Sequence, residues 1–143
     1  MSAQLPEPRL TMVYRLEGAI GEPLEIGDVS TGHRRIIRLD GGTVTGPEIN
    51  GKLLADSSAD WQIVLPDGTA LIDIRYTVQT DGGALLYVQS RGVRVGRGDD
   101  IALRTSTQIE TAARDLDWMN KSVFISVGGV RQGNVIWEIY LVA

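Results

Sequence analysis

Apolar and polar side chains alternate through the middle of the chain in a pattern that predicts three consecutive β-strands. We expect these strands at Trp61–Leu65, Thr69–Val78 and Ala84–Gln89. Pro66-Asp67-Gly68 separates the first two strands, and Thr80-Asp81-Gly82-Gly83 separates the last two. Both connections are typical of tight turns, because Pro presets φ, Asp accepts hydrogen bonds from the turn backbone, and Gly adopts a positive φ easily. The pattern therefore predicts antiparallel strands joined by short turns.

The middle strand has two chemically different faces, since successive side chains of a strand point to opposite sides. One face is largely apolar and consists of Ala70, Ile72, Ile74, Tyr76 and Val78. The other face carries Leu71, Asp73, Arg75 and Thr77. One of the two faces must contact the core. The surroundings of the other face, which carries a carboxylate and a guanidinium group, bear on the function of the protein.

Short alternating segments continue on both sides of this region. They predict strands at Leu10–Glu17, Leu24–Ile26, Arg34–Leu39, Thr43–Val44, Ile49–Leu54, Ile101–Ile109, Val123–Val127 and Val135–Val142. Residues 55–59 and 90–100 are expected to form loops, and only residues 111–120 show helical spacing, over a turn or two. Eight to ten short strands at hairpin spacing favour an all-β fold, either a barrel or a sandwich. We predict an antiparallel up-and-down barrel, because closure removes exposed sheet edges.

Composition limits the class of protein. The 143 residues suit a single domain spanning 1–143, and 43% of them are hydrophobic, which is enough for a core. The net charge of −4 does not favour a nucleic-acid partner or an anionic membrane surface. There is no Cys and only one His, and no apolar run approaches the ~20 residues of a membrane helix. With no basic, apolar leader at the start, we expect a soluble, cytoplasmic protein.

A series of ordered motifs runs along nearly the whole chain. The motifs are residues 41–47 (GGTVTGP), 59–61 (ADW), 67–70 (DGTA), 74–77 (IRYT), 80–84 (TDGGA), 103–105 (LRT), 109–111 (IET) and 117–120 (DWMN). Together they resemble the bacterial and fungal family called domain of unknown function (DUF) 3237. The resemblance implies a calycin-like antiparallel barrel with an internal cavity, and it implies little about activity. The chain departs from the family pattern at Ser57-Ser58-Ala59, where Gly-Gly-Ala is common, and at Ile109, where an aromatic residue is usual.

Asp60 and Trp61 are the first candidate site residues, at a junction between a loop and a strand. In one interpretation Asp60 lies at the barrel mouth beside an aromatic wall, where desolvation raises the pKa of its carboxyl into the range of a general base. In the other, Asp60 caps backbone donors of its loop and Trp61 belongs to the core.

Arg75 and Tyr76 are candidates from the middle strand. If the face of Arg75 lines the lumen, its guanidinium can hold a carbonyl, enolate or carboxylate group of a ligand. If that face points outward, Arg75 and Asp73 form a solvent-exposed ion pair of little energetic value. The opposite face of this strand is more apolar, which favours an outward position of Arg75. An inward position of Arg75 is possible if the apolar face is buried against another subunit.

Three further candidates come from the helical segment and the strand before it. Glu110 could form an acid/base pair with Asp60, or it could simply complement the start of the helical turn. Asn120 could bind a ligand or tie its turn to a neighbouring strand. Trp118 is a large apolar anchor in either case.

These features leave three functional hypotheses. The first is a cofactor-independent isomerase, cyclase or lyase, in which Asp60 or Glu110 moves a proton and Arg75 stabilises an oxyanion on a small organic substrate. The second is a non-catalytic carrier or sensor of an apolar metabolite, and the third is an assembly module whose barrel is filled with side chains. The sequence contains no nucleotide or metal motif, so we expect no cofactor and no metal. A small, largely apolar molecule with a carbonyl or carboxylate group is expected near Asp60, Trp61, Arg75 and Tyr76.

The last strand carries apolar residues on both faces. Val135, Trp137, Ile139 and Leu141 alternate with Ile136, Tyr140 and Val142. The interior of a small barrel can absorb only one such face, so the other predicts contact with a second subunit. We expect a homo-oligomer, a dimer or larger.

Overall fold

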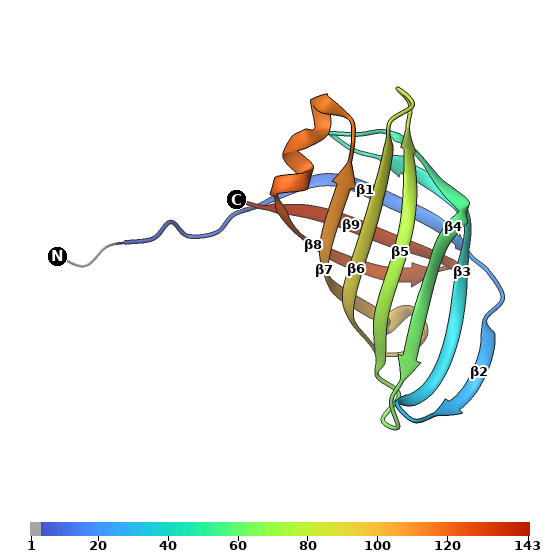
Figure 1. Ribbon diagram of the computed structural model, residues 1–143. Coiled ribbons are helices and arrows are strands. Elements are labelled where there is room, and N and C mark those ends of the chain that lie inside the picture. Colours follow the sequence, from blue (N-terminus) through green and yellow to red (C-terminus); the bar gives the residue numbers. More distant parts are fainter. Residues whose placement is uncertain (1–3) are drawn as a thin grey trace.

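Nine strands form one antiparallel sheet whose two ends meet, in a computed structural model that describes residues 4–143 (Figure 1). The strands are β1 (Leu10–Ile20), β2 (Leu24–Val29), β3 (Gly32–Thr45), β4 (Gly51–Val64), β5 (Ala70–Thr80), β6 (Leu85–Val95), β7 (Ala102–Thr111), β8 (Val123–Arg131) and β9 (Asn134–Val142). Pairing of β1 with both β9 and β3 closes an eight-stranded barrel, and β2 is an additional strand that pairs with β3. The predicted antiparallel up-and-down barrel is confirmed.

Two short 3₁₀ helices interrupt the sheet: η1 (Gly98–Asp100) and η2 (Arg114–Lys121). The helical segment predicted at residues 111–120 corresponds to η2, which lies over one end of the barrel (Figure 1). Met119 of η2 is fully buried, and Trp118 packs against Phe124 with 6.2 Å between the ring centroids. This end of the barrel is therefore closed by apolar side chains.

The turns around β5 have the chemistry that the sequence predicts. Gly68 and Gly83 adopt φ values of +88° and +92° in the turns before and after the strand. The Thr69 N–H donates to the Asp67 carboxylate over 2.9 Å, so this Asp accepts a turn hydrogen bond as expected. Both turns join neighbouring antiparallel strands in register.

The apolar face of β5 points into the barrel. Ala70, Ile72, Ile74, Tyr76 and Val78 are all buried, and most of them pack with inward residues of the other strands in one core cluster. The intervening residues, Arg75 among them, point outward. The outward placement of Arg75, one of the two alternatives that the sequence left open, is the one observed.

Several strands are longer than the sequence pattern predicts, three of them by five residues or more. β4 includes residues 55–59, β6 continues to Val95, and β3 runs from Gly32 to Thr45 without a break. The predicted loops at 55–59 and at the start of 90–100 are corrected by this result. Irregular pairing hides two of these strands in the sequence, because the register shifts between Leu54 and Ala59 of β4 and between Arg38 and Gly42 of β3, which interrupts the alternation. β6 pairs without such a shift.

Among residues 4–143, no helix is long and apolar enough to cross a membrane.

Candidate active site

An internal cavity of about 210 Å³ lies in the half of the barrel remote from η2. Arg35 and Ile101, which line it, are half-buried, so the cavity opens at this end of the barrel. Most of the wall is aliphatic and consists of Ile20, Ile37, Leu39, Ile72, Ile74, Ile101, Leu103, Val130 and Val135. The polar lining is small and consists of Arg35, Asp60, Gln62, Arg94 and Trp137. A largely apolar pocket with a few convergent polar groups is typical of small-molecule sites.

A bulge in β4 determines which side chains enter the cavity. Leu53, before the bulge, is in the core, and strict alternation from it would place Trp61 inside and Asp60 outside. The register shift between Leu54 and Ala59 reverses this phase, so Asp60 points inward and Trp61 outward. The hydroxyl of Ser58 holds the bulge, because it donates to the Leu54 carbonyl over 2.7 Å and accepts from the Thr77 N–H over 3.3 Å.

Asp60 is fixed by two hydrogen bonds inside the barrel. Its side chain is buried, with 6% of the residue exposed. Oδ1 accepts from the backbone N–H of Asp73 over 3.1 Å, and Oδ2 accepts from the amide of Gln62 over 2.8 Å. The Gln62 Oε1 in turn accepts from Nε of Arg35 over 2.9 Å, which orients the Gln62 amide group toward Asp60. The carboxylate is therefore held rigidly at the cavity wall.

Burial raises the pKa of Asp60 from 3.8 to about 6. Desolvation of the carboxylate is the largest cause, and the negative charge of Asp73 acts in the same direction. The hydrogen bonds from Gln62 and from the Asp73 backbone oppose the rise, as does the positive charge of Arg35. A carboxyl group with this pKa is mostly ionised at neutral pH and accepts a proton readily, which suits a general acid or base.

Two N–H donors at the cavity have no acceptor among residues 4–143: Nε of Arg94 and Nε1 of Trp137. The Nη2 of Arg94 donates to the Gly68 carbonyl over 3.4 Å, so the guanidinium is anchored while its Nε–H stays unpaired. Trp137 is 2% exposed, and its ring lies against Gly128, where a Cβ atom would come within 2.7 Å of Cε3. Buried donors without acceptors are uncommon in folded proteins, so these two mark a place for an acceptor.

The guanidinium of Arg94 belongs to the same electrostatic group as Asp60 and Arg35. Burial is the largest cause of a lowered pKa of Arg94, and the positive charge of Arg35 acts in the same direction. The negative charge of Asp60 opposes this shift. The three charged side chains that line the cavity are therefore close enough to influence one another.

The structure does not bring together the set of residues that the sequence suggests. Trp61 is 38% exposed on the outer face, and the guanidinium carbon of Arg75 lies 5.6 Å from the centroid of its ring. Arg75 also forms an ion pair with Asp73 over 3.6 Å. The predicted cluster of Asp60, Trp61, Arg75 and Tyr76 around one ligand is therefore corrected: of these, only Asp60 lines the cavity.

Tyr76 points into the barrel but lies in the packed half, away from the cavity. Its hydroxyl group forms a hydrogen bond with the hydroxyl group of Tyr14, and both residues are fully buried. Burial raises the pKa of both phenols. Tyr76 therefore packs in the core and does not line the cavity.

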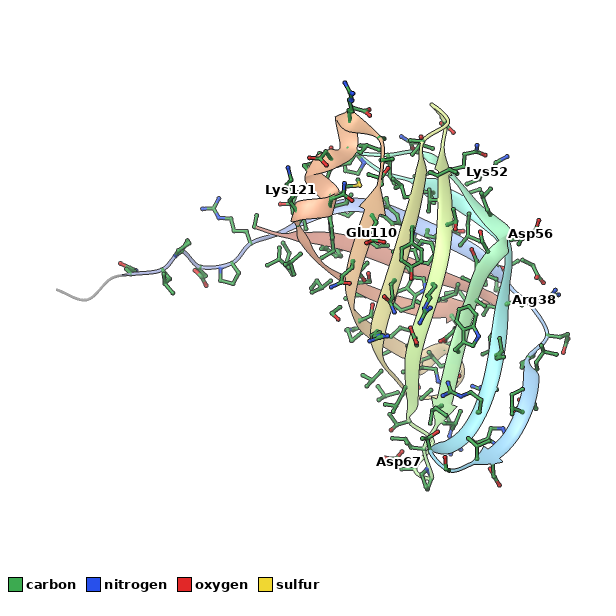
Figure 2. All side chains as sticks on the ribbon, viewed as in Figure 1. Arg38, Lys52, Asp56, Asp67, Glu110 and Lys121 are labelled. Atoms are coloured by element: carbon green, nitrogen blue, oxygen red, sulfur yellow. The ribbon has the colours of Figure 1, made fainter. Side chains whose placement is uncertain are left out.

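Trp118 and Asn120 belong to η2. Glu110 lies near the end of β7 that leads into η2 (Figure 2). Glu110 is exposed on the outer face of β7, so it forms no pair with Asp60. The side chain of Asn120 ties η2 to β7, because its amide donates to the Thr111 carbonyl and its Oδ1 accepts from the Thr111 N–H, both over 2.8 Å. This is the tie that the sequence offered as an alternative to ligand binding.

Sequence reasoning missed Arg35, Gln62, Arg94 and Trp137 as site residues. Gln62 could have been found from Asp60, since residues two apart on a strand share a face. Arg94 lies in a segment interpreted as a loop, and nothing near it in the sequence shows which way it points. Among residues 4–143, no group of three or more His, Asp or Glu side chains could hold a metal ion.

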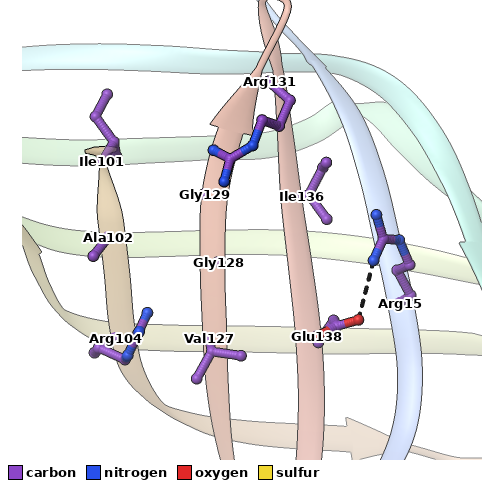
Figure 3. A pocket seen from close by; sticks show the side chains of 10 residues that line it. All are labelled: Arg15, Ile101, Ala102, Arg104, Val127, Gly128, Gly129, Arg131, Ile136 and Glu138. Carbon is purple, nitrogen blue, oxygen red and sulfur yellow. Dashed lines mark hydrogen bonds and ion pairs between the residues drawn. The ribbon is translucent and has the colours of Figure 1, made fainter. Parts of the chain in front are cut away.

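A second, larger hollow of about 430 Å³ lies on the outer surface of β7, β8, β9 and β1 (Figure 3). Its charged side chains already have partners. Arg15 pairs with Glu138 over 3.0 Å, and the guanidinium groups of Arg104 and Arg131 donate to backbone carbonyls. The internal cavity, with its unpaired donors and perturbed carboxyl group, is therefore the better candidate site.

Comparison with known proteins identifies the family. The family model described as "Protein of unknown function (DUF3237)" matches residues 8–142. The chain belongs to the DUF3237 family. The family resemblance drawn from the sequence motifs is thus confirmed.

Relatives of this DUF3237 protein share both sequence and fold. A UPF0311 protein of Rhodopseudomonas palustris is 31% identical over 144 residues, which span 91% of this chain and 94% of the relative. A solved structure described as a beta-barrel like protein from Acinetobacter baumannii is 30% identical, with a TM-score of 0.92 over 99% of this chain and 100% of that one. A structure described as an enzyme from Penicillium herquei has a TM-score of 0.79 at 17% identity and covers all of both chains, which shows a shared fold.

Proposed function

We propose that this DUF3237 protein is a cofactor-independent enzyme that acts by acid/base chemistry on a small, largely apolar carbonyl or carboxylate compound. Its class would be isomerase, cyclase or lyase, and Asp60 would be the group that moves the proton. The observation that carries the proposal is a buried carboxyl group with a pKa of about 6 in the wall of an apolar cavity. Perturbed carboxyl groups in concave apolar sites are typical of catalytic acids and bases.

The geometry suits removal of a proton from carbon next to a carbonyl group. Asp60 takes the proton, the C–H electron pair forms a carbon–carbon double bond, and the carbonyl oxygen acquires the negative charge. The nearby guanidinium groups of Arg35 and Arg94 favour that charge in a site of low dielectric. Return of the proton to another atom gives isomerisation, whereas loss of a group from the β-carbon gives a lyase reaction.

A fixed base makes this transfer efficient. The hydrogen bonds from Gln62 and from the Asp73 backbone hold the carboxylate before a substrate arrives, so little reorganisation accompanies the reaction. The enzyme described from Penicillium herquei supports the proposal only in that the same fold there houses an enzyme.

The proposal is tested by incubating the wild-type protein with a panel of small carbonyl and carboxylate compounds and measuring their consumption by mass spectrometry. Asp60→Asn is expected to abolish turnover and to retain binding, measured by tryptophan fluorescence, because it removes the base and keeps the shape. Asp56→Asn is the matched control, since Asp56 is exposed on the same strand. Loss of turnover in both variants would contradict a specific role for Asp60.

The second candidate function is a non-catalytic carrier or sensor, which the predominantly aliphatic cavity wall favours. A carrier would bind compounds from the panel without consuming any of them, and Asp60→Asn would then change affinity alone. Binding without turnover across the panel would replace the enzyme proposal with this one.

A further inference from the structure

We infer that the ligand of the cavity carries a carboxylate group, which accepts hydrogen bonds from Nε of Arg94 and from Nε1 of Trp137. The inference deepens the proposed function, which leaves the choice between carbonyl and carboxylate open, and rests on it for the location of the site. We expect the carboxylate to be attached to one apolar ring, which fills the aliphatic part of the cavity.

The two unpaired donors are the first support. Arg94 and Trp137 both line the cavity, and neither Nε of Arg94 nor Nε1 of Trp137 has an acceptor within residues 4–143. Buried donors without a partner are uncommon in folded proteins, so two in one cavity point to a ligand that brings acceptors. The donors come from the same row of the sheet, since Arg94 pairs with Leu103, Leu103 with Gly128, and Gly128 with Trp137.

Gly128 explains how this row makes room for the indole. An added Cβ atom would lie within 3 Å of Cε3 and Cδ2 of Trp137, so the ring can pack against β8 only because this residue is Gly. The six-membered side of the indole therefore contacts β8, and Nε1 lies on the other side of the ring. The position of Trp137 is thus fixed without any use of its N–H group.

The charges around the cavity favour an anion. Arg35 from β3 and Arg94 from β6 contribute two positive charges, and Asp60 from β4 contributes at most one negative charge. Asp73 from β5 also acts on Asp60, but its side chain is on the outer face, where Arg75 and Arg91 pair with it. The cavity therefore has a net positive charge whether Asp60 is ionised or neutral. Arg and carboxylate groups form the stronger, charge-assisted kind of hydrogen bond.

The rest of the cavity selects the body of the ligand. The aliphatic wall offers no further hydrogen-bonding groups beyond the polar set already described. An apolar cavity of about 150 Å³ holds benzene, so a cavity of about 210 Å³ accommodates one ring with a small substituent. A ring bearing a carboxylate matches both the volume of the cavity and the predominance of aliphatic side chains in its wall.

Binding of such an anion has a consequence for Asp60. A second negative charge in the same cavity disfavours the ionised form of Asp60 and raises the pKa of its carboxyl further. Since that pKa is already about 6, Asp60 takes up part of a proton when an anion binds at neutral pH. Proton uptake is therefore a signature of carboxylate binding that does not depend on turnover.

The test uses benzoate and its neutral, nearly isosteric analogue benzamide as probes of the full-length protein, in isothermal titration calorimetry. Wild-type protein is expected to bind benzoate about tenfold tighter than benzamide, because one charge-assisted hydrogen bond contributes about that much to the affinity. Titration at pH 7 in buffers of different ionisation enthalpy is expected to show proton uptake with benzoate. Asp60→Asn is expected to abolish the uptake and to retain benzoate binding.

Two variants examine the donors separately. Arg94→Met is expected to weaken benzoate binding about tenfold or more and to remove the preference over benzamide. Trp137→Phe keeps an aromatic ring, removes the N–H group and is expected to weaken benzoate binding several-fold. Arg91→Met is the matched control on the same strand, because Arg91 is exposed on the outer face, and it is expected to bind like the wild type. Circular dichroism confirms that each variant is folded.

The outcomes separate the inference from the proposed function. Equal affinity for benzamide and benzoate, an unchanged Arg94→Met variant, or no benzoate binding at about 1 mM would overturn the inference. Turnover of neutral carbonyl compounds that requires Asp60 would in that case leave the proposed function standing. Selective benzoate binding with proton uptake supports the inference even if no compound of the panel is consumed.

Discussion

The backbone N–H of Asp73 donates to Oδ1 of Asp60 over 3.1 Å, so a residue whose side chain is outside the barrel fixes a carboxylate inside it. Gln62 completes the arrangement from within the cavity, because its amide donates to Oδ2 of Asp60 over 2.8 Å. The carboxylate thus has one partner in the backbone, which only a substitution by Pro would remove, and one in a side chain, which most substitutions of Gln62 would remove.

Replacement of Gln62 should change the titration of Asp60. The hydrogen bond from Gln62 lowers the pKa of Asp60, so Gln62→Met is expected to move that pKa upward from about 6. A hydrogen bond to a charged group is worth about 1.5–3 kcal/mol, so we expect a rise of about one pH unit or more. NMR titration of the Asp60 carboxyl carbon measures this directly. Gln79→Met, outside the cavity, is the control, and an unchanged or lowered pKa in Gln62→Met would contradict the assignment.

Asp60 should reduce the stability of the protein at neutral pH. Its folded-state pKa of about 6 lies above the ordinary value of 3.8, so the folded state binds the proton more tightly than the unfolded state. The stabilisation from the protonated carboxyl is complete below pH 3.8 and is lost as pH rises through about 6. The difference corresponds to at most about 3 kcal/mol.

Asp60→Asn removes this dependence. The variant is expected to be more stable than the wild type by about 1–3 kcal/mol at pH 8 and to lose that advantage near pH 4. Urea unfolding of both proteins across this pH range measures the difference, with Asp56→Asn as the control. If the difference in stability between the two proteins does not vary with pH, the pKa of Asp60 is not raised in the folded state.

Arg75→Gln should leave ligand binding unchanged. Arg75 lies over Trp61 on the outer face and does not line the cavity, so its charge contributes through an exposed cation–π contact of about 0.5–1 kcal/mol. We expect a small loss of stability in urea unfolding and the wild-type affinity for benzoate in calorimetry. A loss of affinity comparable to that of Arg94→Met would restore Arg75 to the site.

The fold is largely predictable from the sequence because its signals are local. The turn at Asp67-Gly68 and the alternation from Ala70 to Val78 depend on residues within a few positions of one another. The site is not predictable in the same way. The bulge between Leu54 and Ala59 reverses which side chains of β4 face inward, and its presence depends on pairing with β5.

The two unpaired donors are even less predictable from the sequence. Arg94 and Trp137 are far apart in the printed sequence, and only the register of β6 to β9 places them in one row. Asp60 can be found from the sequence because a family motif includes it, although the loop predicted just before it is part of strand β4. The residues that complete its surroundings have no such local signal.

The buried pair of Tyr14 and Tyr76 should contribute to stability and not to binding. Tyr76→Phe leaves the Tyr14 hydroxyl without its partner in a fully buried position, which is expected to cost about 1–3 kcal/mol. The double variant Tyr14→Phe with Tyr76→Phe removes both polar groups and is expected to recover part of the loss. Urea unfolding of the wild type, Tyr14→Phe, Tyr76→Phe and the double variant measures the coupling. An affinity for benzoate that falls with Tyr76→Phe would place Tyr76 near the ligand after all.

The outer face of β9 should be covered by another subunit. Val135, Trp137 and Ile139 are buried inside the barrel, which leaves Ile136, Tyr140 and other apolar residues half-buried on the outside. Apolar side chains gathered on one outer face are typical of contacts between copies, and a symmetric dimer is the commonest arrangement.

Sedimentation of the wild-type protein at micromolar concentration is expected to show a species of at least twice 15.5 kDa. Ile136→Lys is expected to shift this species toward the monomer. Leu71→Lys, at an exposed outward position of β5 away from β9, is the control and is expected to sediment like the wild type. A wild-type protein that sediments only at 15.5 kDa would contradict the prediction.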